Sequence, residues 1–218
     1  MGYRAVLFDL DGTLLNTLED LADSMNAVLG ASGFPVHGLK DYKVFVGDGI
    51  ENLVRRALPG PKRLDEDTVT RCLASMRQKY GKRRKDKTRP YEGVPELLDK
   101  LVAGGIRMGI LSNKPDESTK TVVAELLPHW KFDAVFGERP GTPRKPDPSG
   151  AIEIANLMRI PCGQFLYVGD TGTDMKTANA AGMFAVGALW GFRKADELQE
   201  HGAKVLIEKP GDLMRLLQ

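Results

Sequence analysis

Cysteine and histidine are scarce in this chain of 218 residues, and no apolar run approaches the length of a membrane span. The two cysteines, Cys72 and Cys162, provide neither a disulfide framework nor a zinc site. The histidines His37, His129 and His201 are scattered without the spacing of metal ligands. A net charge of +2 is too mild to indicate nucleic-acid binding. The first residues lack the layout of a signal peptide, so we expect a cytoplasmic protein with reduced thiols that binds neither nucleic acid nor membrane.

Short apolar runs alternate with segments of helical periodicity over most of the chain. This alternation predicts an α/β fold whose core is a Rossmann-like parallel sheet with helices on both faces. The expected strands are Ala5–Leu10, Arg107–Leu111, Ala134–Phe136, Phe165–Gly169, Phe184–Ala188 and Val205–Ile207. The expected helices between them are Gly93–Ala103, Asp116–Leu127, Pro148–Met158, Thr173–Ala180 and Lys194–His201.

Residues 16–91 interrupt the alternation, because this stretch contains helical patterns only. We therefore expect a small all-helical cap domain at 16–91, inserted into a core formed by residues 1–15 and 92–218. The chain leaves the first strand near Asp11 and returns near Pro90, so the cap is expected to hang over the mouth of the site and to exclude water there. The expected cap helices are Leu18–Ser32, Gly49–Leu58 and Asp65–Tyr80.

Four carboxylates lie in two clusters, and each cluster follows an apolar, strand-like run. Asp9 and Asp11 form the first cluster, and Asp170 and Asp174 form the second. Residues two apart on a strand face the same side, so Asp9 and Asp11 are expected to address one ligand. The carboxyl ends of parallel strands meet at one edge, where Asp9, Ser112 and Asp170 should converge. Such clusters are costly to assemble without a positive charge between them, which makes a divalent cation the obvious candidate.

The chain contains four motifs in order: Asp9-Leu-Asp-Gly-Thr-Leu14, Leu111-Ser-Asn113, Arg144-Lys-Pro-Asp-Pro148 and Gly169-Asp-Thr-Gly-Thr-Asp174. In order and spacing they resemble the motifs of the haloacid dehalogenase superfamily of aspartate-nucleophile phosphatases. The resemblance covers essentially the whole chain. It implies a Mg²⁺-dependent phosphatase that hydrolyses a small phosphate monoester through an aspartyl-phosphate intermediate.

The resemblance also assigns roles to single residues. Asp9 would attack phosphorus, and Asp11 would protonate the leaving oxygen and then activate water. Mg²⁺ would be bound by Asp9, by the backbone carbonyl of Asp11 and by Asp170, since oxygen ligands suit this cation. The other implied residues are the phosphate-binding Ser112, Asn113 and Lys145 and the supporting Thr13, Thr171 and Asp174, the last acting through water or the outer shell of the metal.

A glycine-rich turn in the predicted cap is the candidate substrate loop. Gly47, Asp48 and Gly49 precede a helical stretch and mimic a dinucleotide-binding turn, but Asn52 stands at the place of the third glycine and no strand follows at the right distance. We expect this loop to face the active site and to contribute to substrate choice; a plain helix-entry turn is the alternative. Arg56, or its neighbour Arg55, is the candidate partner of a substrate carboxylate.

Two further features of the sequence have ordinary structural interpretations. The basic run Lys82–Arg89 is expected to be a solvated helix end near the point where the cap returns to the core. Trp130 and Trp190 flank no basic patch and are expected to be packing residues.

The residues near the candidate nucleophile Asp9, above all Asp11, indicate the subfamily. Asp11 argues against the dehalogenase branch, whose members lack a carboxylate at that position. The chain resembles the phosphoglycolate phosphatase group and the related small pyrophosphatases, so a small phosphorylated metabolite is the expected partner and phosphoglycolate the leading substrate. Inorganic pyrophosphate and 5′-nucleotides are the alternatives, and a non-catalytic binding protein is less favoured. The sequence specifies neither the substrate nor whether the protein is a monomer or a dimer.

Overall fold

The computed structural model describes residues 2–217, and the chain forms two compact units. The first unit comprises the N-terminal segment up to Leu15 together with the chain from Pro90 onwards. The second unit comprises Asn16–Arg89.

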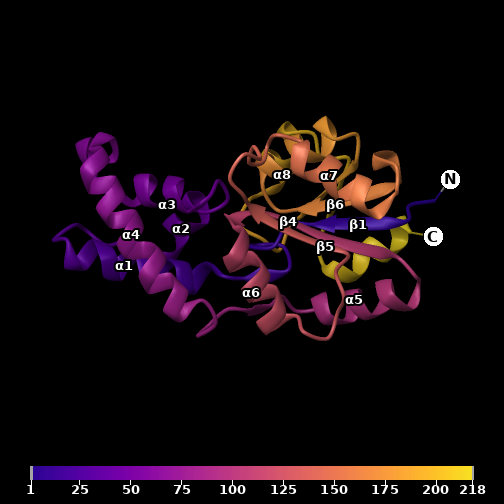
Figure 1. Cartoon of the computed structure of the whole chain (residues 1–218), viewed down its shortest axis with the longest axis horizontal. Helices are drawn as coiled ribbons and strands as arrows, with labels where there is room; N and C mark the ends of the chain where they lie inside the picture. The colour runs from indigo at the N-terminus through magenta and orange to yellow at the C-terminus, as the bar shows by residue number, and fades with distance from the viewer. Residues whose placement is uncertain (1, 218) are drawn as a thin grey trace. The chain divides into compact units, whose positions relative to one another are not determined.

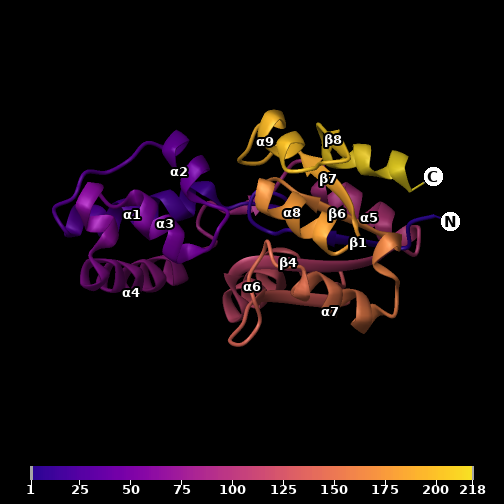
Figure 2. The ribbon, with the colours of Figure 1, turned by 90° about the horizontal axis from the view of Figure 1, so that it is seen from above.

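A six-stranded parallel sheet forms the centre of the first unit (Figure 1). The strand order is β5-β4-β1-β6-β7-β8, and Figure 2 shows β4, β1, β6, β7 and β8 following one another in this order. After β1 the chain fills one side of the sheet and then crosses to the other side, so the order reverses around β1, where ligands of such sheets bind. The strands are β1 (Ala5–Phe8), β4 (Arg107–Pro115), β5 (Ala134–Glu138), β6 (Phe165–Gly169), β7 (Phe184–Ala188) and β8 (Val205–Ile207).

Helices cover both faces of this sheet, as the sequence predicts (Figure 1). Alternate residues of β1 serve two separate cores: Val6 and Phe8 belong to one, and Ala5 and Leu7 to the other. The first core is closed by α5 (Val94–Ala103), α6 (Asp116–Leu126) and the 3₁₀ helix η3 (Pro210–Leu216). The second is closed by α7 (Ser149–Met158), α8 (Gly172–Ala180) and α9 (Ala195–Glu200), and the 3₁₀ helix η2 (Cys162–Gln164) precedes β6.

The first strand is shorter than the sequence predicts, because the chain turns immediately after it. β1 ends at Phe8, and the carbonyl of Leu10 accepts hydrogen bonds from the amides of Leu14 and Leu15, both at 3.0 Å. The prediction that Asp9 and Asp11 lie on one strand face is therefore wrong. The turn directs the two carboxylates to different partners.

The second site strand is longer than predicted. β4 continues to Pro115, with a shift in its register against β5 between Leu111 and Pro115. Ser112 therefore lies within the strand and not at its end, and the chain stays extended through Lys114.

The second unit consists mainly of packed helices. It contains α1 (Leu18–Ala31), α2 (Leu39–Phe45), α3 (Ile50–Ala57), the 3₁₀ helix η1 (Gly60–Leu64) and α4 (Glu66–Arg83). At its ends, β2 (Leu15–Asn16) and β3 (Arg89–Pro90) form a two-stranded pair, which the helices-only prediction misses.

The sequence pattern also misses α2, which is held by tertiary contacts. Tyr42 is fully buried, and its hydroxyl donates to Oδ1 of Asn26 at 2.7 Å. Its ring meets the ring of Phe45 edge-on, with 5.5 Å between the centroids. These contacts outweigh the weak helical preference of the β-branched Val44 in this segment.

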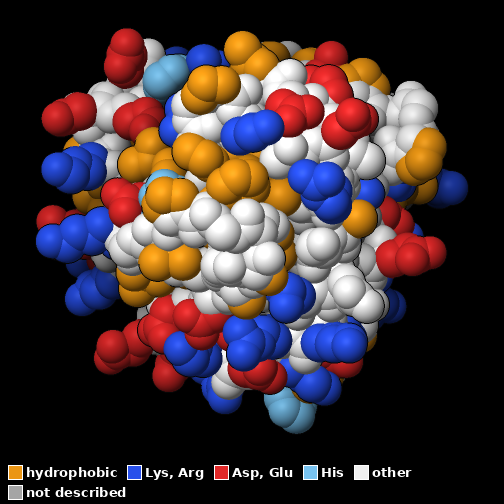
Figure 3. All heavy atoms as spheres, turned by 90° about the vertical axis from the view of Figure 1, so that its left-hand side faces the viewer, with side chains coloured by type: hydrophobic (Ala, Val, Ile, Leu, Met, Phe, Trp, Pro, Cys, Tyr) orange, Lys and Arg blue, Asp and Glu red, His pale blue; other side chains and the backbone are white. Residues whose placement is uncertain are grey.

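Figure 3 presents one face of the helical unit, on which acidic and basic side chains surround an area where apolar side chains gather. Large apolar side chains of this unit that are exposed include Val36, Leu39, Val44 and Leu64.

Within residues 2–217, none of the helices combines the length and the apolar character that crossing a membrane would require.

A buried carboxylate connects the first helix of this unit to the end of the basic run. Asp20 is 1% exposed and accepts hydrogen bonds from the amides of Lys87, at 3.1 Å, and Thr88, at 2.8 Å. The hydroxyl of Thr88 donates to the same carboxylate at 2.7 Å. The basic run is thus fastened to α1 through its backbone, while its basic side chains are mostly exposed.

We expect Asp20→Ala to destabilise the protein by roughly 3 kcal/mol, because it leaves buried amide donors without an acceptor. The matched control is Asp23→Ala, which removes an exposed ion pair of the same helix with Lys87 and should cost less than about 1 kcal/mol. Urea denaturation followed by circular dichroism measures both changes. Equal effects of the two substitutions would contradict a structural role of the Asp20 carboxylate.

Candidate active site

The ends of three neighbouring strands bring the carboxylates of the first and fourth motifs together. Phe8 of β1 pairs with Ile110 of β4 on one side and with Val168 of β6 on the other. The next residue, Asp9, donates its amide to the carbonyl of Val168 at 2.9 Å. As a result, carboxylate oxygens of Asp9, Asp170 and Asp174 lie within 4.8 Å of one another, and all three side chains are buried.

A buried lysine from the third motif joins this cluster. Nζ of Lys145 lies 2.8 Å from Oδ1 of Asp9 and 2.7 Å from Oδ1 of Asp174, and its side chain is 2% exposed. The backbone of Lys145 is held by Asn113, which accepts from its amide at 2.9 Å and donates to its carbonyl at 3.1 Å. Asn113 therefore fixes the backbone of Lys145 through both its carbonyl oxygen and its amide nitrogen.

Asp174 is occupied on both oxygens by groups of the protein. Oδ1 accepts from Lys145, and Oδ2 accepts from the amide and the hydroxyl of Thr171 at 3.1 and 2.6 Å. Thr171 is the N-cap of α8, and its hydroxyl accepts in turn from the amide of Asp174. This reciprocal capping box begins the helix and aims one carboxylate oxygen at Lys145.

Asp170 is fully buried between two segments of the chain. Its Oδ1 accepts from the hydroxyl of Thr13 at 3.0 Å, and its Oδ2 accepts from the amide of Phe192 at 2.8 Å. Gly12 and Gly191 lie so close to it that a Cβ on either would collide with the Asp170 side chain. Both positions therefore require glycine, and Gly12 also has a φ of 91°.

The electrostatics of the cluster favour a bound cation. Burial, reinforced by Asp174, raises the pKa of Asp9 well above its usual value although Lys145 opposes the shift. Burial and the charge of Asp174 raise the pKa of Asp170 to about 7. Burial lowers the pKa of Lys145, but the charges of Asp174 and Asp9 outweigh this, so its pKa is raised and the ammonium is retained.

Three buried carboxylates thus share one ammonium group in this cluster. When all are ionised, an excess of two negative charges remains in a place from which water is largely excluded. Asp9 and Asp170 each retain oxygen lone pairs, and hard oxygen donors are what Mg²⁺ prefers. The residues present therefore fit a divalent cation.

A second ion pair lies beside this cluster, and sequence reasoning missed its lysine. Nζ of Lys114 lies 2.9 and 2.7 Å from the two oxygens of Asp11, and the side chains are 4% and 15% exposed, respectively. The amide of Lys114 donates to Oγ of Ser112 at 3.2 Å. The available signal was the spacing: Ser112 and Lys114 are two apart on an extended strand, so they share a side.

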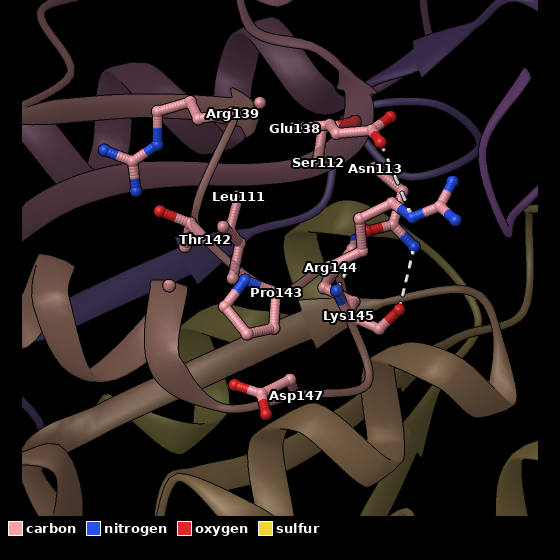
Figure 4. A pocket seen from close by; sticks show the side chains of 12 residues that line it. Leu111, Ser112, Asn113, Glu138, Arg139, Thr142, Pro143, Arg144, Lys145 and Asp147 are labelled. Carbon is pink, nitrogen blue, oxygen red and sulfur yellow. Dashed lines mark hydrogen bonds and ion pairs between the residues drawn. The ribbon is translucent and has the colours of Figure 1, made fainter.

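The loop that carries Lys145 is fastened by paired charges around a shallow hollow next to β4 (Figure 4). Arg139 lies 3.9 Å above the ring of Phe136 and donates to both carboxylate oxygens of Glu153. Arg144 contacts Glu138 at 3.6 Å. Arg139 and Arg144 each pair with a glutamate, Glu153 and Glu138 respectively, and these ion pairs hold the loop in which Lys145 lies.

The predicted substrate loop lies in the helical unit, and Arg56 of α3 binds it through an ion pair and backbone hydrogen bonds. Gly47 and Gly49 have φ values of 123° and 89°, and Asp48 between them forms an ion pair with Arg56. Arg56 also donates to the backbone carbonyls of Val44 and Phe45, at 3.3 and 3.1 Å. α2 ends at Phe45 and Val46 is its C-cap, so a helix and not a strand leads into this turn. Arg55 is paired with Glu51 and Glu66.

The comparisons with known proteins agree with this arrangement. A family model described as haloacid dehalogenase-like hydrolase matches residues 6–188. A relative from Nitrosospira multiformis, named phosphoglycolate phosphatase, is 32% identical over 99% of this chain and 96% of its own. One of the same name from Pseudomonas syringae pv. tomato is 31% identical over 98% of this chain and 78% of its own. A solved structure from Lactobacillus delbrueckii subsp. bulgaricus, named as a candidate phosphoglycolate phosphatase, is 30% identical, covers 100% of this chain and 99% of its own, and has a TM-score of 0.92. This chain belongs to the haloacid dehalogenase-like hydrolase family.

Proposed function

We propose that this protein is a Mg²⁺-dependent phosphatase that hydrolyses a small phosphate monoester through an aspartyl-phosphate on Asp9. The observation that carries the proposal is the pairing of Asp9 with Lys145 inside a cluster of buried carboxylates. Such a cluster is unfavourable for folding alone, since each carboxylate raises the cost of ionising the others. Phosphoryl transfer needs this combination of a held nucleophile and concentrated positive charge.

The metal would be held by Asp9, by the backbone carbonyl of Asp11 and by Asp170. When bound, Mg²⁺ supplies positive charge that offsets the repulsion between the carboxylate nucleophile and the phosphate dianion. Thr13 orients Asp170 through its hydroxyl, and Thr171 orients Asp174. Asp174 acts on Lys145, because both of its oxygens already accept hydrogen bonds from the protein.

In the first step, an oxygen of Asp9 forms a bond to phosphorus while the bond from phosphorus to the leaving oxygen breaks. Asp11, in its protonated form, gives its proton to that leaving oxygen and becomes a carboxylate. Ser112 and Lys145 hold the phosphoryl oxygens, and Asn113 contributes by placing Lys145. The products of this step are the free alcohol and the aspartyl-phosphate.

In the second step, Asp11 takes a proton from a water molecule that attacks the aspartyl-phosphate. The bond between phosphorus and the Asp9 oxygen breaks, which releases inorganic phosphate and restores both carboxylates to their starting forms. Lys114 contacts both oxygens of Asp11, so it holds the carboxylate in one orientation for this proton transfer.

Phosphoglycolate is the leading substrate, because the relatives described above carry that name and cover nearly the whole chain. We propose that residues 16–91 act as a cap and that Gly47, Asp48, Gly49 and Arg56 contribute to substrate choice. Inorganic pyrophosphate and 5′-nucleotides are the competing substrates. Phosphate release from a panel of these compounds, with Mg²⁺ and with EDTA, tests the proposal.

We expect Asp9→Asn to fold but to lose turnover of every phosphate ester, because a neutral amide cannot form the aspartyl-phosphate. The matched control is Asp67→Asn, which changes an exposed aspartate of α4 and should leave turnover unchanged. Phosphate release measures both, and circular dichroism checks the fold. Retained turnover in Asp9→Asn would exclude Asp9 as the nucleophile.

We expect Mg²⁺ to raise the melting temperature more at pH 7.5 than at pH 5. The pKa of Asp170 is about 7 in the folded protein and about 3.9 in the unfolded chain, so the metal-free protein loses stability as the pH rises through this window. Bound Mg²⁺ stabilises the ionised carboxylates and removes that loss. Thermal unfolding with MgCl₂ or EDTA measures the shift, and Asp170→Asn should abolish it. A shift that is equal or smaller at pH 7.5 would contradict the predicted coupling.

We expect Lys114→Met to impair the proton transfers of Asp11 more than the attack by Asp9. Turnover of alkyl phosphates should fall at least about tenfold, within the usual contribution of acid–base catalysis. Single-turnover release of 4-nitrophenol from 4-nitrophenyl phosphate should fall much less, because this leaving group needs little proton donation. Lys114→Arg should rescue part of the loss, and Lys120→Met, an exposed lysine of α6, is the control. Equal losses with both leaving groups would contradict this role.

A further inference from the structure

A tryptophan that the mechanism does not use is connected to the proposed metal ligand Asp170 by hydrogen bonds. Nε1 of Trp190 donates to the backbone carbonyl of Thr13 at 2.9 Å. The hydroxyl of the same Thr13 donates to Oδ1 of Asp170 at 3.0 Å. Two residues after the tryptophan, the amide of Phe192 donates to Oδ2 of Asp170 at 2.8 Å. The sequence predicts only a packing role for Trp190, and its ring does pack against the core next to β1.

These contacts close a ring around one carboxylate. The ring joins the turn after β1, through Gly12 and Thr13, to the segment after β7, through Trp190 and Phe192. The absence of space for a Cβ at Gly12 and at Gly191 means that both segments lie directly against the Asp170 side chain. Each oxygen of Asp170 accepts one hydrogen bond from a different segment, so the carboxylate can rotate only if the two segments separate.

The indole N–H links the two segments directly, in addition to their shared hold on Asp170. Without it, Thr13 and Phe192 would each still reach the carboxylate, but their spacing would no longer be fixed. Substitution of the partners that orient a metal ligand in this way typically lowers metal affinity about 10- to 100-fold.

We propose that Trp190 is a positioning residue for the metal site: its indole N–H fixes the segment 12–13 against the segment 190–192 and so sets the Mg²⁺ affinity of Asp170. This inference rests on the proposed function, because it concerns the same metal. The proposal predicts that Trp190 changes the Mg²⁺ affinity of the site, which a side chain with only a packing role would not do.

The chain offers a matched control in its other tryptophan. Trp130 also donates its indole N–H to another part of the chain, to Oδ1 of Asp99 at 2.8 Å, and it also packs at the edge of the same core. Asp99 belongs to α5 and to none of the four motifs. Trp190→Phe and Trp130→Phe therefore each remove one indole hydrogen bond and keep an aromatic ring, but only the first should affect the metal.

The test is titration calorimetry with MgCl₂ on the full-length, chelator-treated protein at pH 7.5. We expect Trp190→Phe to weaken Mg²⁺ binding roughly tenfold, the lower end of the loss found for outer-shell partners of a metal. Trp130→Phe should bind Mg²⁺ within about twofold of the unaltered protein. Equal affinity in the two variants would overturn the inference and leave the proposed function intact, whereas no Mg²⁺ binding by the unaltered protein would contradict the proposed function itself.

Fluorescence keeps the inference testable if Trp190→Phe does not fold. In Trp130→Phe the sole tryptophan is Trp190, unaltered, because the chain contains two in all. Its emission should change with MgCl₂ and saturate at the same concentration as the rise in melting temperature. Emission that stays constant while Mg²⁺ raises the melting temperature would show that Trp190 does not sense the metal site, and the inference would fail.

Discussion

The mutual repulsion of three buried carboxylates is the constraint on which the rest of the site depends. Asp9, Asp170 and Asp174 lie within 4.8 Å of one another, with one ammonium group among them. Hydrogen-bond donors hold both oxygens of Asp170 and of Asp174, and two positions beside Asp170 have no room for any side chain. Such an arrangement costs stability in the metal-free protein, which is common where a fold holds charges ready for a ligand.

The parallel sheet makes this concentration of charge possible. Its central strands are buried on both faces and carry mainly apolar side chains, so the charged groups of the site gather toward the carboxyl ends of the strands. The order of strands reverses around β1, which brings the ends of β1 and β6 side by side although 157 residues separate Thr13 from Asp170 in the chain. Local helix chemistry then completes the site, since the capping box of α8 that begins the helix also aims Asp174 at Lys145.

Sequence reasoning recovers the parts of this structure that depend on pattern. The sheet strands are predicted because each is a short apolar run between turn residues, and the first and fourth motifs mark the ends of β1 and β6. Sequence reasoning fails where individual hydrogen bonds of the folded chain determine the local structure. The turn at Leu10 moves Asp11 off the strand, and the buried hydroxyl of Tyr42 holds a helix that propensity does not favour. Lys114 was missed because most lysines are exposed, and only a carboxylate distant in sequence, Asp11, explains its burial.

The two lysines divide the charges of the site into separate pairs. Lys145 contacts Asp9 and Asp174, whereas Lys114 contacts both oxygens of Asp11. In the proposed reaction Asp11 gives up a proton and takes one back in each cycle. Asp9 loses its own carboxylate charge when it bonds to phosphorus, whose oxygens remain charged, and regains it when the aspartyl-phosphate is hydrolysed. If one lysine served both carboxylates, each change of charge on one would disturb the position of the other. Separate partners allow Asp11 to change its protonation while Lys145, anchored by Asp174, keeps its place beside the nucleophile.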